Sequence, residues 1–449
     1  MLDDLVRRYS KPVPRYTSYP TAPHFHPGID RLVYADWLRS IPDDTSLSLY
    51  VHVPFCDRLC WFCGCHTKQV LRYDPIAAYI PVVMHEIAAV ADLLGGRGRV
   101  TALHLGGGSP SMLQRADLFR LTALIRQRFT IARNFEFSIE IDPNDMVPER
   151  YVDLAEAGVT RASIGVQDFD PKVQQAINRL QSFEQTAEVV EGVRACGVAS
   201  VNLDVLYGLP FQTLEGLERT VAQTLSLSPD RLALFGYAHV PWLKTHQRMI
   251  DESALPGVLE RFAQSTQAAA QIRAAGYDSI GIDHFARPTD GLAQAARQHR
   301  LHRNFQGYTT DAAPALLGFG ASAIGSLPQG YVQNHVPTGE YKREVTEHGL
   351  AVVRGVALTA EDHMRRWVIE RLMCDFAVPL DELKERFGHP ADAVTAEMHG
   401  VALSDSDGLV TLDGTSFTMT EKGRPFVRSI AAAFDSYLAS GNARHSLAV

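Results

Sequence analysis

Short apolar runs typical of buried β-strands alternate with amphipathic helical stretches through the middle of this 449-residue chain. The six strand-like runs are residues 47–53, 100–105, 136–141, 161–166, 200–206 and 231–237. A helix between two neighbouring strands carries the chain back across the sheet, so the next strand pairs in parallel. Six such units are too few to close an eight-stranded barrel. The alternation therefore predicts either a partial (β/α)6 barrel or an open doubly wound sheet.

The residues that follow the first predicted strand decide between these two folds. A dinucleotide-binding sheet carries a glycine-rich turn at this place. Here residues 47–53 run instead into a cluster of cysteines. This difference favours the partial barrel, an α/β half-barrel similar to a TIM barrel. We expect it to carry an irregular N-terminal segment and a small, mainly helical C-terminal domain.

Four of the six cysteines lie within ten residues, with the spacing C-x3-C-x2-C through Cys56, Cys60 and Cys63, followed by Cys65. Tight thiolate clusters bind soft metals or iron–sulfur centres. Three thiolates on one loop suit three corners of a [4Fe–4S] cube whose fourth iron takes a non-protein ligand. A zinc ion would need a fourth ligand, which Cys65 or His66 would provide, and a disulfide is a third alternative. Ligand count and spacing favour the iron–sulfur cluster.

Polar residues and glycines stand at the ends of all six predicted strands. In chain order they are Cys56, then Gly106, Gly107, Gly108, Ser109 and Pro110, then Glu140 and Asp142, Gln167 and Asp168, Asp204, and Tyr237, Ala238 and His239. The carboxyl ends of barrel strands meet at one edge, where the chemistry of such folds is found. Six strands that each bring such groups to the same edge predict one functional site there.

The chemistry of this edge has more than one interpretation from the residues alone. The three glycines after the second strand form either a plain turn or a place where backbone groups approach a ligand closely. Glu140 and Asp204 are either structural acids paired with arginines or partners for an ammonium group or a ribose. Gln167 and Arg179 offer a neutral and a cationic contact nearby.

Composition excludes several classes of function. The formal net charge of −8 and the pI near 6.1 argue against a nucleic-acid partner held on a basic surface. No long uninterrupted apolar run predicts a membrane span, and the first residues lack the apolar segment of a secretory signal. Clustered cysteines without such a signal indicate the reducing cytoplasm. The isolated Cys196 and Cys374 are interpreted as ordinary buried thiols.

The pattern divides the chain into four units. They are an N-terminal segment at 1–45, the barrel at 46–290, an extension facing the site at 291–355 and a C-terminal domain at 356–449. In the last unit we expect a hairpin at 409–420 and a final helix at 423–439, as in a winged-helix fold. Since the chain is acidic, we expect this domain to serve as a packing surface or a lid.

The N-terminal segment is rich in proline and aromatic residues, with the run PRYTSYP at 14–20. Its prolines prevent long helices. One interpretation is a segment that lies across the main domain. The other is a flap that brings Arg15, Tyr16 and Tyr19 over an anionic substrate.

Beyond these separate signals, the motifs as a set resemble a known family. C-x3-C-x2-C followed by GGGSP, SIEIDP and GVQ is similar to the radical S-adenosylmethionine (SAM) enzymes. More narrowly, the chain resembles the family of oxygen-independent coproporphyrinogen III oxidases, through the motifs YVHVPFC, CWFCGC, LHLGGGSP, NRLQ, NLDVLYGLP, FGYAHVP, DHFARP, HRNFQGYTT and GASAIG. These motifs run from residue 50 to 325, and PRYTSYP extends the likeness towards the N-terminus.

The resemblance implies roles for individual residues. Cys56, Cys60 and Cys63 would bind a [4Fe–4S] cluster, whereas Cys65 would lie near the substrate without being a cluster ligand. SAM bound to the cluster would contact Tyr50, Phe62, Gly107 and Glu140. A second SAM would contact Gly108, Ser109, Gln167, Arg179, Asp204, Ala238 and Ile324. Where the family often has GGGTP, this chain has Ser109, which keeps the hydroxyl.

The resemblance also implies the reaction. The reduced cluster would cleave SAM to a 5′-deoxyadenosyl radical, which takes a hydrogen from a propionate side chain of coproporphyrinogen III. Loss of CO2 and of one electron would leave a vinyl group, and two such steps, on rings A and B, would give protoporphyrinogen IX in haem biosynthesis. The radical is carried by SAM, so no side chain is predicted to be catalytic. The remaining propionates need cations, for which Arg15, Arg303 and Lys68 are candidates, and Tyr16, Tyr19 and Tyr308 would pack against the tetrapyrrole.

Two other functions compete with this interpretation. A haem-binding chaperone related in sequence is the first, and the CGC end, PRYTSYP and HRNFQGYTT argue against it. A structural zinc protein is the second, and it leaves the polar edge without a ligand. For the oxidase we expect an electron donor such as flavodoxin or ferredoxin, an unknown electron acceptor and a monomer, because no sustained heptad pattern is present.

Overall fold

The computed structural model describes residues 2–438, and its centre is one curved 12-stranded sheet. The strand order is β16-β15-β14-β13-β1-β4-β5-β6-β7-β8-β10-β9. Six strands in the middle of this order are parallel and follow one another in the chain, which confirms the predicted partial (β/α)6 barrel. They are β1 (Ser46–Val53), β4 (Arg99–Gly107), β5 (Thr130–Ile141), β6 (Arg161–Gln167), β7 (Ser200–Tyr207) and β8 (Arg231–Gly236).

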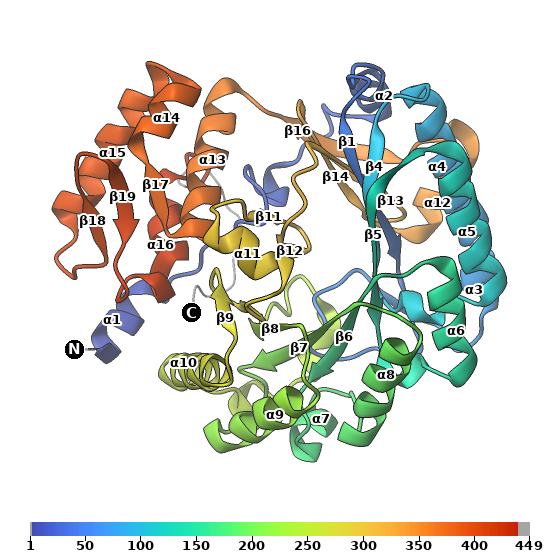
Figure 1. Cartoon of the computed structure of the whole chain (residues 1–449), viewed down its shortest axis with the longest axis horizontal. Coiled ribbons are helices and arrows are strands. Elements are labelled where there is room, and N and C mark those ends of the chain that lie inside the picture. Colours follow the sequence, from blue (N-terminus) through green and yellow to red (C-terminus); the bar gives the residue numbers. More distant parts are fainter. Residues whose placement is uncertain (1, 439–449) are drawn as a thin grey trace.

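Helices cover the convex face of the curved sheet (Figure 1). They are α4 (Ile80–Leu94), α5 (Arg115–Arg128), α6 (Pro148–Ala157), α8 (Phe183–Ala195), α9 (Leu214–Ser226) and α10 (Val258–Ala274). The alternation of side chains along each strand explains this arrangement. In β1, Leu47, Leu49, Val51 and Val53 are at most 1% exposed and join the main hydrophobic core with residues of these helices. The residues between them face the concave side, which is left open towards the C-terminal domain.

The sheet continues beyond the six predicted strands at both ends. Strand β13 (Ala315–Phe319) pairs in parallel with β1, and β14 (Ile324–Leu327), β15 (Gly330–Asn334) and β16 (Val352–Ala357) follow as antiparallel strands. At the other end, β10 (His284–Ala286) and β9 (Asp278–Ile280) add to β8. The region predicted as a separate extension at 291–355 therefore contributes strands to the barrel's own sheet.

One helical stretch, Asp74–Leu94, is long and apolar enough to span a membrane by length and composition. It contains α3 (Asp74–Ala77) and α4, and the sequence had led us to expect no membrane span. In the structure Ile80, Val83, Ile87 and Val90 are at most 1% exposed and belong to the barrel core. Core helices of soluble proteins have the same composition, so this helix is explained by its place over the sheet.

The C-terminal domain is built mainly from α13 (Ala360–Asp375), α14 (Leu380–Phe387) and α15 (Pro390–Ser404). The predicted hairpin is present as β18 (Val410–Leu412) and β19 (Ser416–Met419), to which β17 (Ala377–Pro379) adds. The predicted long final helix is wrong for the described residues, because only α16 (Val427–Ala431) forms, with 3₁₀ turns on both sides. Gly423 and Pro425 precede it and disfavour an earlier start. Residue 439 lies outside the described residues.

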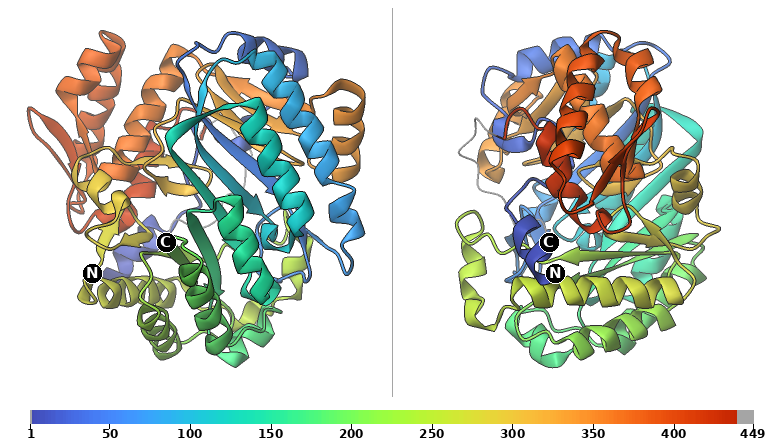
Figure 2. Two further views of the ribbon diagram at one scale, coloured as in Figure 1. Left: turned by 45° about the vertical axis from the view of Figure 1, so that its right-hand side comes forward. Right: turned by 90° about the vertical axis from the view of Figure 1, so that its left-hand side faces the viewer.

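The N-terminal segment packs against the C-terminal domain and not as a free flap. Helix α1 (Leu2–Tyr9) lies beside that domain and α10, and α2 (Arg31–Arg39) forms between the prolines (Figures 1 and 2). Leu5, Val6 and Val13 are buried in the same hydrophobic cluster as α13 and α15. Between this domain and the barrel lies a small hairpin, β11 (His302–Asn304) with β12 (Gly307–Thr309).

Candidate active site at the carboxyl edge of the barrel

The cysteines lie on a closed loop that leaves the end of β1 and returns to it. Strand β2 (Phe55–Cys56) pairs in parallel with β3 (Lys68–Gln69), which joins the two ends of the loop. The amide of Lys68 donates to the carbonyl of Pro54 at 2.8 Å, and the amide of Val70 donates to that of Cys56 at 2.9 Å. These bonds fix the base of the loop, so its cysteines are presented at the carboxyl edge of the barrel.

Groups from the segments that follow β6 and β8 hold the outer part of this loop. The amide of Trp61 donates to the carbonyl of Ile177 at 2.9 Å. The buried Gln247 amide donates both to the carbonyl of Phe62, at 2.9 Å, and to that of Ala238, at 3.2 Å. Gln247 therefore ties the cysteine loop to the end of β8, and it brings together two residues predicted to contact SAM.

The backbone carbonyls of Cys63 and Cys65 also accept hydrogen bonds from side chains in the segment after β8. His246 Nε2 lies 2.7 Å from the carbonyl oxygen of Cys63, and Lys244 donates to the carbonyl of Cys65 at 3.0 Å. Neither residue was singled out in the sequence. Their place after the FGYAHVP motif was the available signal, but nothing in the spacing shows that this segment turns back onto the cysteine loop.

All six cysteines are free thiols, so the disulfide alternative is wrong in this structure. Cys60 is buried, Cys56 and Cys63 are half-buried and Cys65 is exposed. The backbone N–H of Cys65 donates to the sulfur of Cys63 at 3.4 Å. Burial, together with the neighbouring Cys63 and Cys60, raises the pKa of the Cys56 thiol to about 12. Cys60 and Cys63 both act electrostatically on Cys56, and Cys63 acts on Cys60, so the three thiols share one neighbourhood, as the ligands of one cluster must.

Arg179 supplies positive charge to this group of sulfurs. Its Nη1 lies 3.7 Å from the Cys60 sulfur and 2.9 Å from Asp142 Oδ2, and its Nη2 donates to the carbonyl of Gly165 at 2.9 Å. Burial raises the pKa of Cys60, whereas Arg179 opposes that shift. The Nε of Arg179 is buried without a hydrogen-bond partner. A cationic donor beside three thiols suits the negative charge that a thiolate-bound cluster carries.

The donor set therefore fits a [4Fe–4S] cluster better than a single zinc ion. A zinc site requires four ligands gathered tetrahedrally around one small ion. Among residues 2–438, no three His, Cys, Asp or Glu side chains converge closely enough to hold a single metal ion. A cubane is much larger than one ion, and three thiols on one loop with an open side match it.

Glu140 stands at the end of β5, beside the glycines that end β4. Its Oε2 accepts a hydrogen bond from the Gly107 amide at 2.8 Å, and its Oε1 lies 3.3 Å from His104 Nε2. Burial opposes ionisation of Glu140, but His104 and the Gly107 amide outweigh it and hold the pKa of this carboxyl below its usual value. The site therefore contains a carboxylate that stays charged, as a partner for an ammonium group requires.

Gly107 is a position where no other residue fits. Its φ is +113°, and a Cβ there would stand 2.5 Å from the His52 ring. The His52 ring is held from both sides, because Nδ1 lies 2.9 Å from the Tyr50 hydroxyl and Nε2 lies 2.8 Å from the carbonyl of His66. The glycines after β4 are therefore not a plain turn, since they let backbone approach Tyr50, His52 and Glu140 closely.

The concave face of the barrel is lined by polar side chains. Asp204 accepts hydrogen bonds from Ser163, at 3.1 Å, and from Asn202, at 2.8 Å, so it is paired with neutral donors and not with an arginine. Burial raises the pKa of Asp204. Ser163 and Asn202 were missed in the sequence, although strand alternation places them on the same face as Glu140 and Asp204.

Gln167 has an unusual backbone conformation at the end of β6. Its φ is +67°, and the pairing of β6 with β7 shifts by one residue between Gly165 and Gln167. Such a bulge turns a strand-end side chain away from the regular alternation. A non-glycine residue in this conformation is costly, so the surrounding structure must hold it there.

Two further predicted SAM contacts have different surroundings. The Ser109 hydroxyl is buried and bonded to Ser111 and Asp145, so it does not offer a free donor to a ligand. Ile324 begins β14, one strand beyond β13, whose Gly318 pairs with Tyr50 of β1. A Cβ at Gly318 would stand 2.6 Å from the carbonyl oxygen of Ile324. Ile324 is therefore next to the residue that pairs with Tyr50, on the side of β1 opposite β4.

The three tyrosines predicted to pack against a tetrapyrrole are all buried. Tyr16 and Tyr19 are 4% and 1% exposed in the core of the C-terminal domain, where their hydroxyls bond Asp435 and Ser436. The Tyr308 hydroxyl donates to the carbonyl of Met373 at 2.7 Å. We therefore correct these three predictions, because buried and satisfied side chains leave no face for a substrate. An aromatic motif alone does not distinguish packing from binding.

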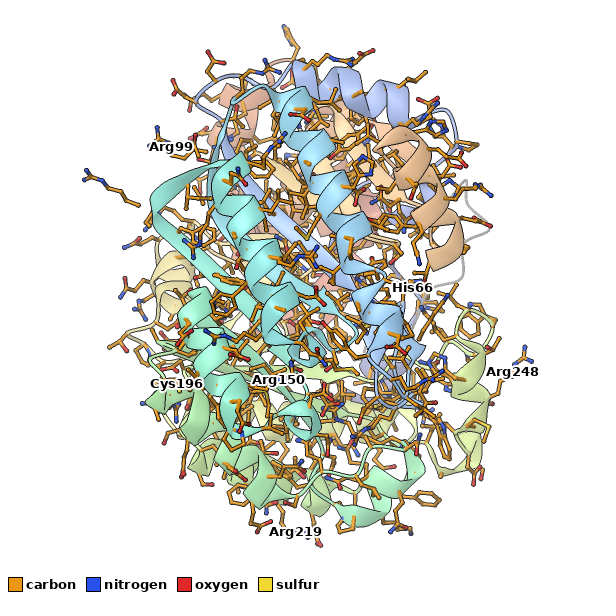
Figure 3. The ribbon with its side chains drawn as sticks, turned by 90° about the vertical axis from the view of Figure 1, so that its right-hand side faces the viewer. His66, Arg99, Arg150, Cys196, Arg219 and Arg248 are labelled. Carbon is orange, nitrogen blue, oxygen red and sulfur yellow. The ribbon has the colours of Figure 1, made fainter. Side chains whose placement is uncertain are left out.

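Of the predicted cationic contacts, Lys68 is exposed in β3, while Arg15 and Arg303 lie together near the end of β8. Cys374 is buried as predicted, whereas Cys196 is only half-buried and packs against the barrel core. Figure 3 shows it on the opposite side of the view from His66 in the cysteine loop. The structure thus brings one loop, six strand ends and two arginines to a single edge.

A cysteine loop after the first strand of a partial barrel, with glycines and a charged carboxylate beside it, defines the radical SAM class of enzymes. The family model described as Radical SAM superfamily matches residues 50–223, and that described as HemN C-terminal domain matches residues 358–426.

Full-length relatives narrow this class. The oxygen-independent coproporphyrinogen III oxidase of Bradyrhizobium diazoefficiens is 48% identical, covering 100% of both chains, and that of Escherichia coli is 39% identical, covering 97% of this chain and 95% of its own. The solved structure of coproporphyrinogen III oxidase (HemN) from Escherichia coli, a radical SAM enzyme, superposes with a TM-score of 0.91 at 38% identity, covering 94% of this chain and 98% of the other. The chain belongs to the oxygen-independent coproporphyrinogen III oxidase family.

Proposed function

We propose that this protein converts the ring A and ring B propionates of coproporphyrinogen III to vinyl groups without oxygen, giving protoporphyrinogen IX in haem biosynthesis. The observation that carries this proposal is likeness over the whole chain, from the cysteine loop to the C-terminal domain, to oxidases of this name. The charged carboxylate and free thiols at the barrel edge supply the groups that such an enzyme needs.

A [4Fe–4S] cluster with SAM, when bound, supplies the carbon radical that removes a hydrogen atom from the substrate. We assign the cluster to Cys56, Cys60 and Cys63, which are free thiols on one loop that the pairing of β2 with β3 closes. Arg179, beside Cys60, would stabilise the negative charge of the ligated thiolates. Cys65 is exposed on the same loop, and we place it near the substrate and not among the cluster ligands.

The chain's own residues bind and orient the reactants. Glu140, held ionised by His104 and the Gly107 amide, would bind the ammonium group or ribose of SAM. Tyr50 would border the same region, because it stacks on His104 and bonds His52, and Phe62 would do so beside Cys63. Backbone at Gly107 would approach the ligand closely, which its missing Cβ permits.

A second SAM molecule is a finer part of this proposal. Its contacts would be Gly108, Ser109, Gln167, Arg179, Asp204, Ala238 and Ile324. Support comes from the bulge and positive φ of Gln167 and from the buried, unpartnered Nε of Arg179. Ser109 would take part through its backbone, because its hydroxyl is bonded to Ser111 and Asp145.

The likeness to the oxidases favours this function over a haem-binding chaperone. We also propose that the protein works in the cytoplasm as a monomer, with a flavodoxin or ferredoxin as electron donor and an acceptor whose identity is open. Six free thiols are consistent with a reducing compartment.

An anaerobic assay tests the function directly. Reconstituted protein is mixed with SAM, a reductant and coproporphyrinogen III, and the vinyl product and 5′-deoxyadenosine are measured together. We expect both to form. Deoxyadenosine without product would mean that the radical chemistry is right and the substrate wrong. If neither forms while haem binds tightly, the chaperone function replaces the oxidase.

A further inference from the structure

Three arginines from distant parts of the chain meet near the end of β8. Arg15 lies in the N-terminal segment, Arg261 in the first turn of α10 and Arg303 in β11; we name them the arginine cluster. Arg15 Nη2 donates to the carbonyl of Gly236 at 3.0 Å, and Arg261 Nη2 donates to that of the next residue, Tyr237, at 2.9 Å. Arg303 Nη2 lies 3.4 Å from the backbone oxygen of Arg15.

The cluster has more positive charge than its surroundings neutralise. Its nearest acid is Asp283, whose Oδ1 is 3.9 Å from Arg303 Nη1 and is shared with His284 at 2.7 Å. Among residues 2–438, neither Arg15 nor Arg261 has a carboxylate within ion-pair distance. Burial lowers the pKa of Arg261, and Arg15 lowers it further. Buried charges are normally paired, so a group of cations with one shared acid is incomplete without an anion.

Donors within the cluster are also unused. The Arg303 side chain is only 5% exposed, and its Nε and Nη1 are buried without a hydrogen-bond partner. The Nε of Arg261 is in the same state. Each such donor costs free energy unless a ligand accepts from it, and guanidinium groups bind carboxylates through pairs of parallel hydrogen bonds.

Aromatic rings hold two of these guanidinium groups in place. Arg303 lies over the Tyr308 ring, with 4.4 Å between its Cζ and the ring centroid, and Arg261 lies 5.6 Å from the centroid of Tyr207. The Tyr308 hydroxyl is itself fixed on the Met373 carbonyl. This stacking keeps the guanidinium planes ordered while their in-plane N–H donors stay available.

The arginine cluster shares the concave side of the barrel with Glu140. Asp204 of β7 interacts electrostatically with both Glu140 and His284. His284 bonds Asp283, which in turn faces Arg303. A continuous series of polar groups therefore crosses from the carboxylate that we assign to SAM to the arginine cluster.

We propose that the arginine cluster binds the propionate carboxylates that the reaction leaves in place, and so orients the tetrapyrrole with its reacting propionates towards Glu140. This inference rests on the proposed function and deepens it by naming the substrate groups held and the residues that hold them. Arg261, in a helix with no family motif, becomes a specificity-determining residue. The N-terminal segment contributes to the site through Arg15, while its tyrosines anchor it to the C-terminal domain.

The test measures binding apart from turnover. Coproporphyrin III, the oxidised tetracarboxylate, and its tetramethyl ester are titrated by fluorescence into anaerobically reconstituted wild-type protein and into Arg15→Gln, Arg261→Gln and Arg303→Gln. The matched control is Arg219→Gln, an exposed arginine on α9 (Figure 3). The visible absorbance of the [4Fe–4S] cluster and the affinity for SAM are measured for every protein.

We expect each of the three arginine variants to bind coproporphyrin III roughly tenfold to a hundredfold more weakly than wild type, with unchanged SAM affinity. The ester should bind weakly and equally to all proteins, and Arg303→Lys should recover part of the affinity. Arg15 is exposed, so Arg15→Gln keeps the test valid even if a buried variant fails to fold.

Two outcomes would overturn the inference, and a third would overturn the function on which it rests. Wild-type turnover together with unchanged coproporphyrin affinity in all three variants would reject the arginine cluster and leave the proposed function standing. Loss of SAM affinity in place of coproporphyrin affinity would assign the arginines to the cofactor. A wild-type protein that neither binds coproporphyrin nor turns over its reduced form would reject the function itself.

Discussion

Glu140 shows how single residues make this barrel edge reactive. Burial alone would raise the pKa of the Glu140 carboxyl, yet the His104 ring and the Gly107 amide both stabilise the charged form. Gly107 can do so because its φ of +113° and missing Cβ let its amide reach the carboxylate beside His52. The charge at Glu140 is thus a product of two neighbouring strand ends.

Replacing Glu140 with glutamine should weaken SAM binding. The variant keeps the shape of the side chain but loses the charge that would hold an ammonium group or strengthen a bond to ribose. We expect affinity for SAM to fall roughly tenfold to a hundredfold, with the cluster's absorbance unchanged. Equilibrium binding of SAM to the reconstituted protein measures this, with the exposed Glu156→Gln as control. Equal affinity in both variants would remove Glu140 from the SAM site.

The cysteines give a second prediction at the scale of residues. Cys56→Ala, Cys60→Ala and Cys63→Ala should each abolish cluster assembly and activity, since three thiolates are needed to hold the cube. Cys196→Ala should assemble a full cluster, because Cys196 packs on the barrel core away from the loop. Iron and sulfide content with the visible spectrum decide the matter, and an active Cys60→Ala protein would refute the cluster assignment.

Among the elements, α4 is fixed to the extended sheet by one buried acid. Glu86 accepts hydrogen bonds from the Gly320 amide at 2.8 Å, the Tyr341 hydroxyl at 2.7 Å and the Asn334 amide at 2.7 Å. These partners come from α12 (Thr338–His348), β15 and the end of β13. Burial raises the pKa of Glu86 to about 7, although these hydrogen bonds oppose the shift.

The raised pKa of Glu86 predicts a pH-dependent stability. Between about 4.5, its ordinary value, and about 7, the folded protein keeps a proton that the unfolded chain releases. The free energy of unfolding should therefore fall as the pH rises through this window, by roughly 3 kcal/mol from this group. Glu86→Gln, which does not titrate, should flatten the dependence of Tm on pH, whereas the exposed Glu215→Gln should not. Parallel pH curves for wild type and Glu86→Gln would contradict this account.

At the scale of the whole molecule, the two ends of the chain form one unit. Five apolar or aromatic side chains of the N-terminal segment, namely Leu5, Val6, Val13, Tyr16 and Tyr19, are buried with the C-terminal domain. Arg428 donates to the carbonyls of Val13 and Pro14 at 2.7 and 3.2 Å. This attachment fixes Arg15 at the open side of the barrel.

Deleting residues 1–20 should therefore destabilise the C-terminal domain as well as impair turnover. Exposure of these five side chains would cost on the order of 5 kcal/mol or more. Thermal unfolding and limited proteolysis of the truncated protein measure the effect, and cluster content should be preserved. A mobile flap would instead leave the unfolding temperature unchanged, so an unaltered Tm would contradict the packing described here.

Much of the barrel could be predicted from local sequence. The six strands differ from the predicted runs mainly at their ends, because alternation and helical periodicity are properties of neighbouring residues. The spacing of Cys56, Cys60 and Cys63 and the glycines before Ser109 likewise depend only on local chain geometry. The final helix was overestimated because tertiary packing of α16 overrides the local pattern after Pro425.

The sequence by itself determined the class of fold, the cysteine loop and the edge of the sheet at which the chemistry lies. Only the tertiary structure decided that Tyr16, Tyr19 and Tyr308 are buried and that Arg261 joins Arg15 and Arg303. Some of those contacts link residues hundreds of positions apart, such as Arg15 with Gly236 and with Arg303. They depend on how the barrel, the hairpin and the two chain ends pack together, which no local period or spacing records.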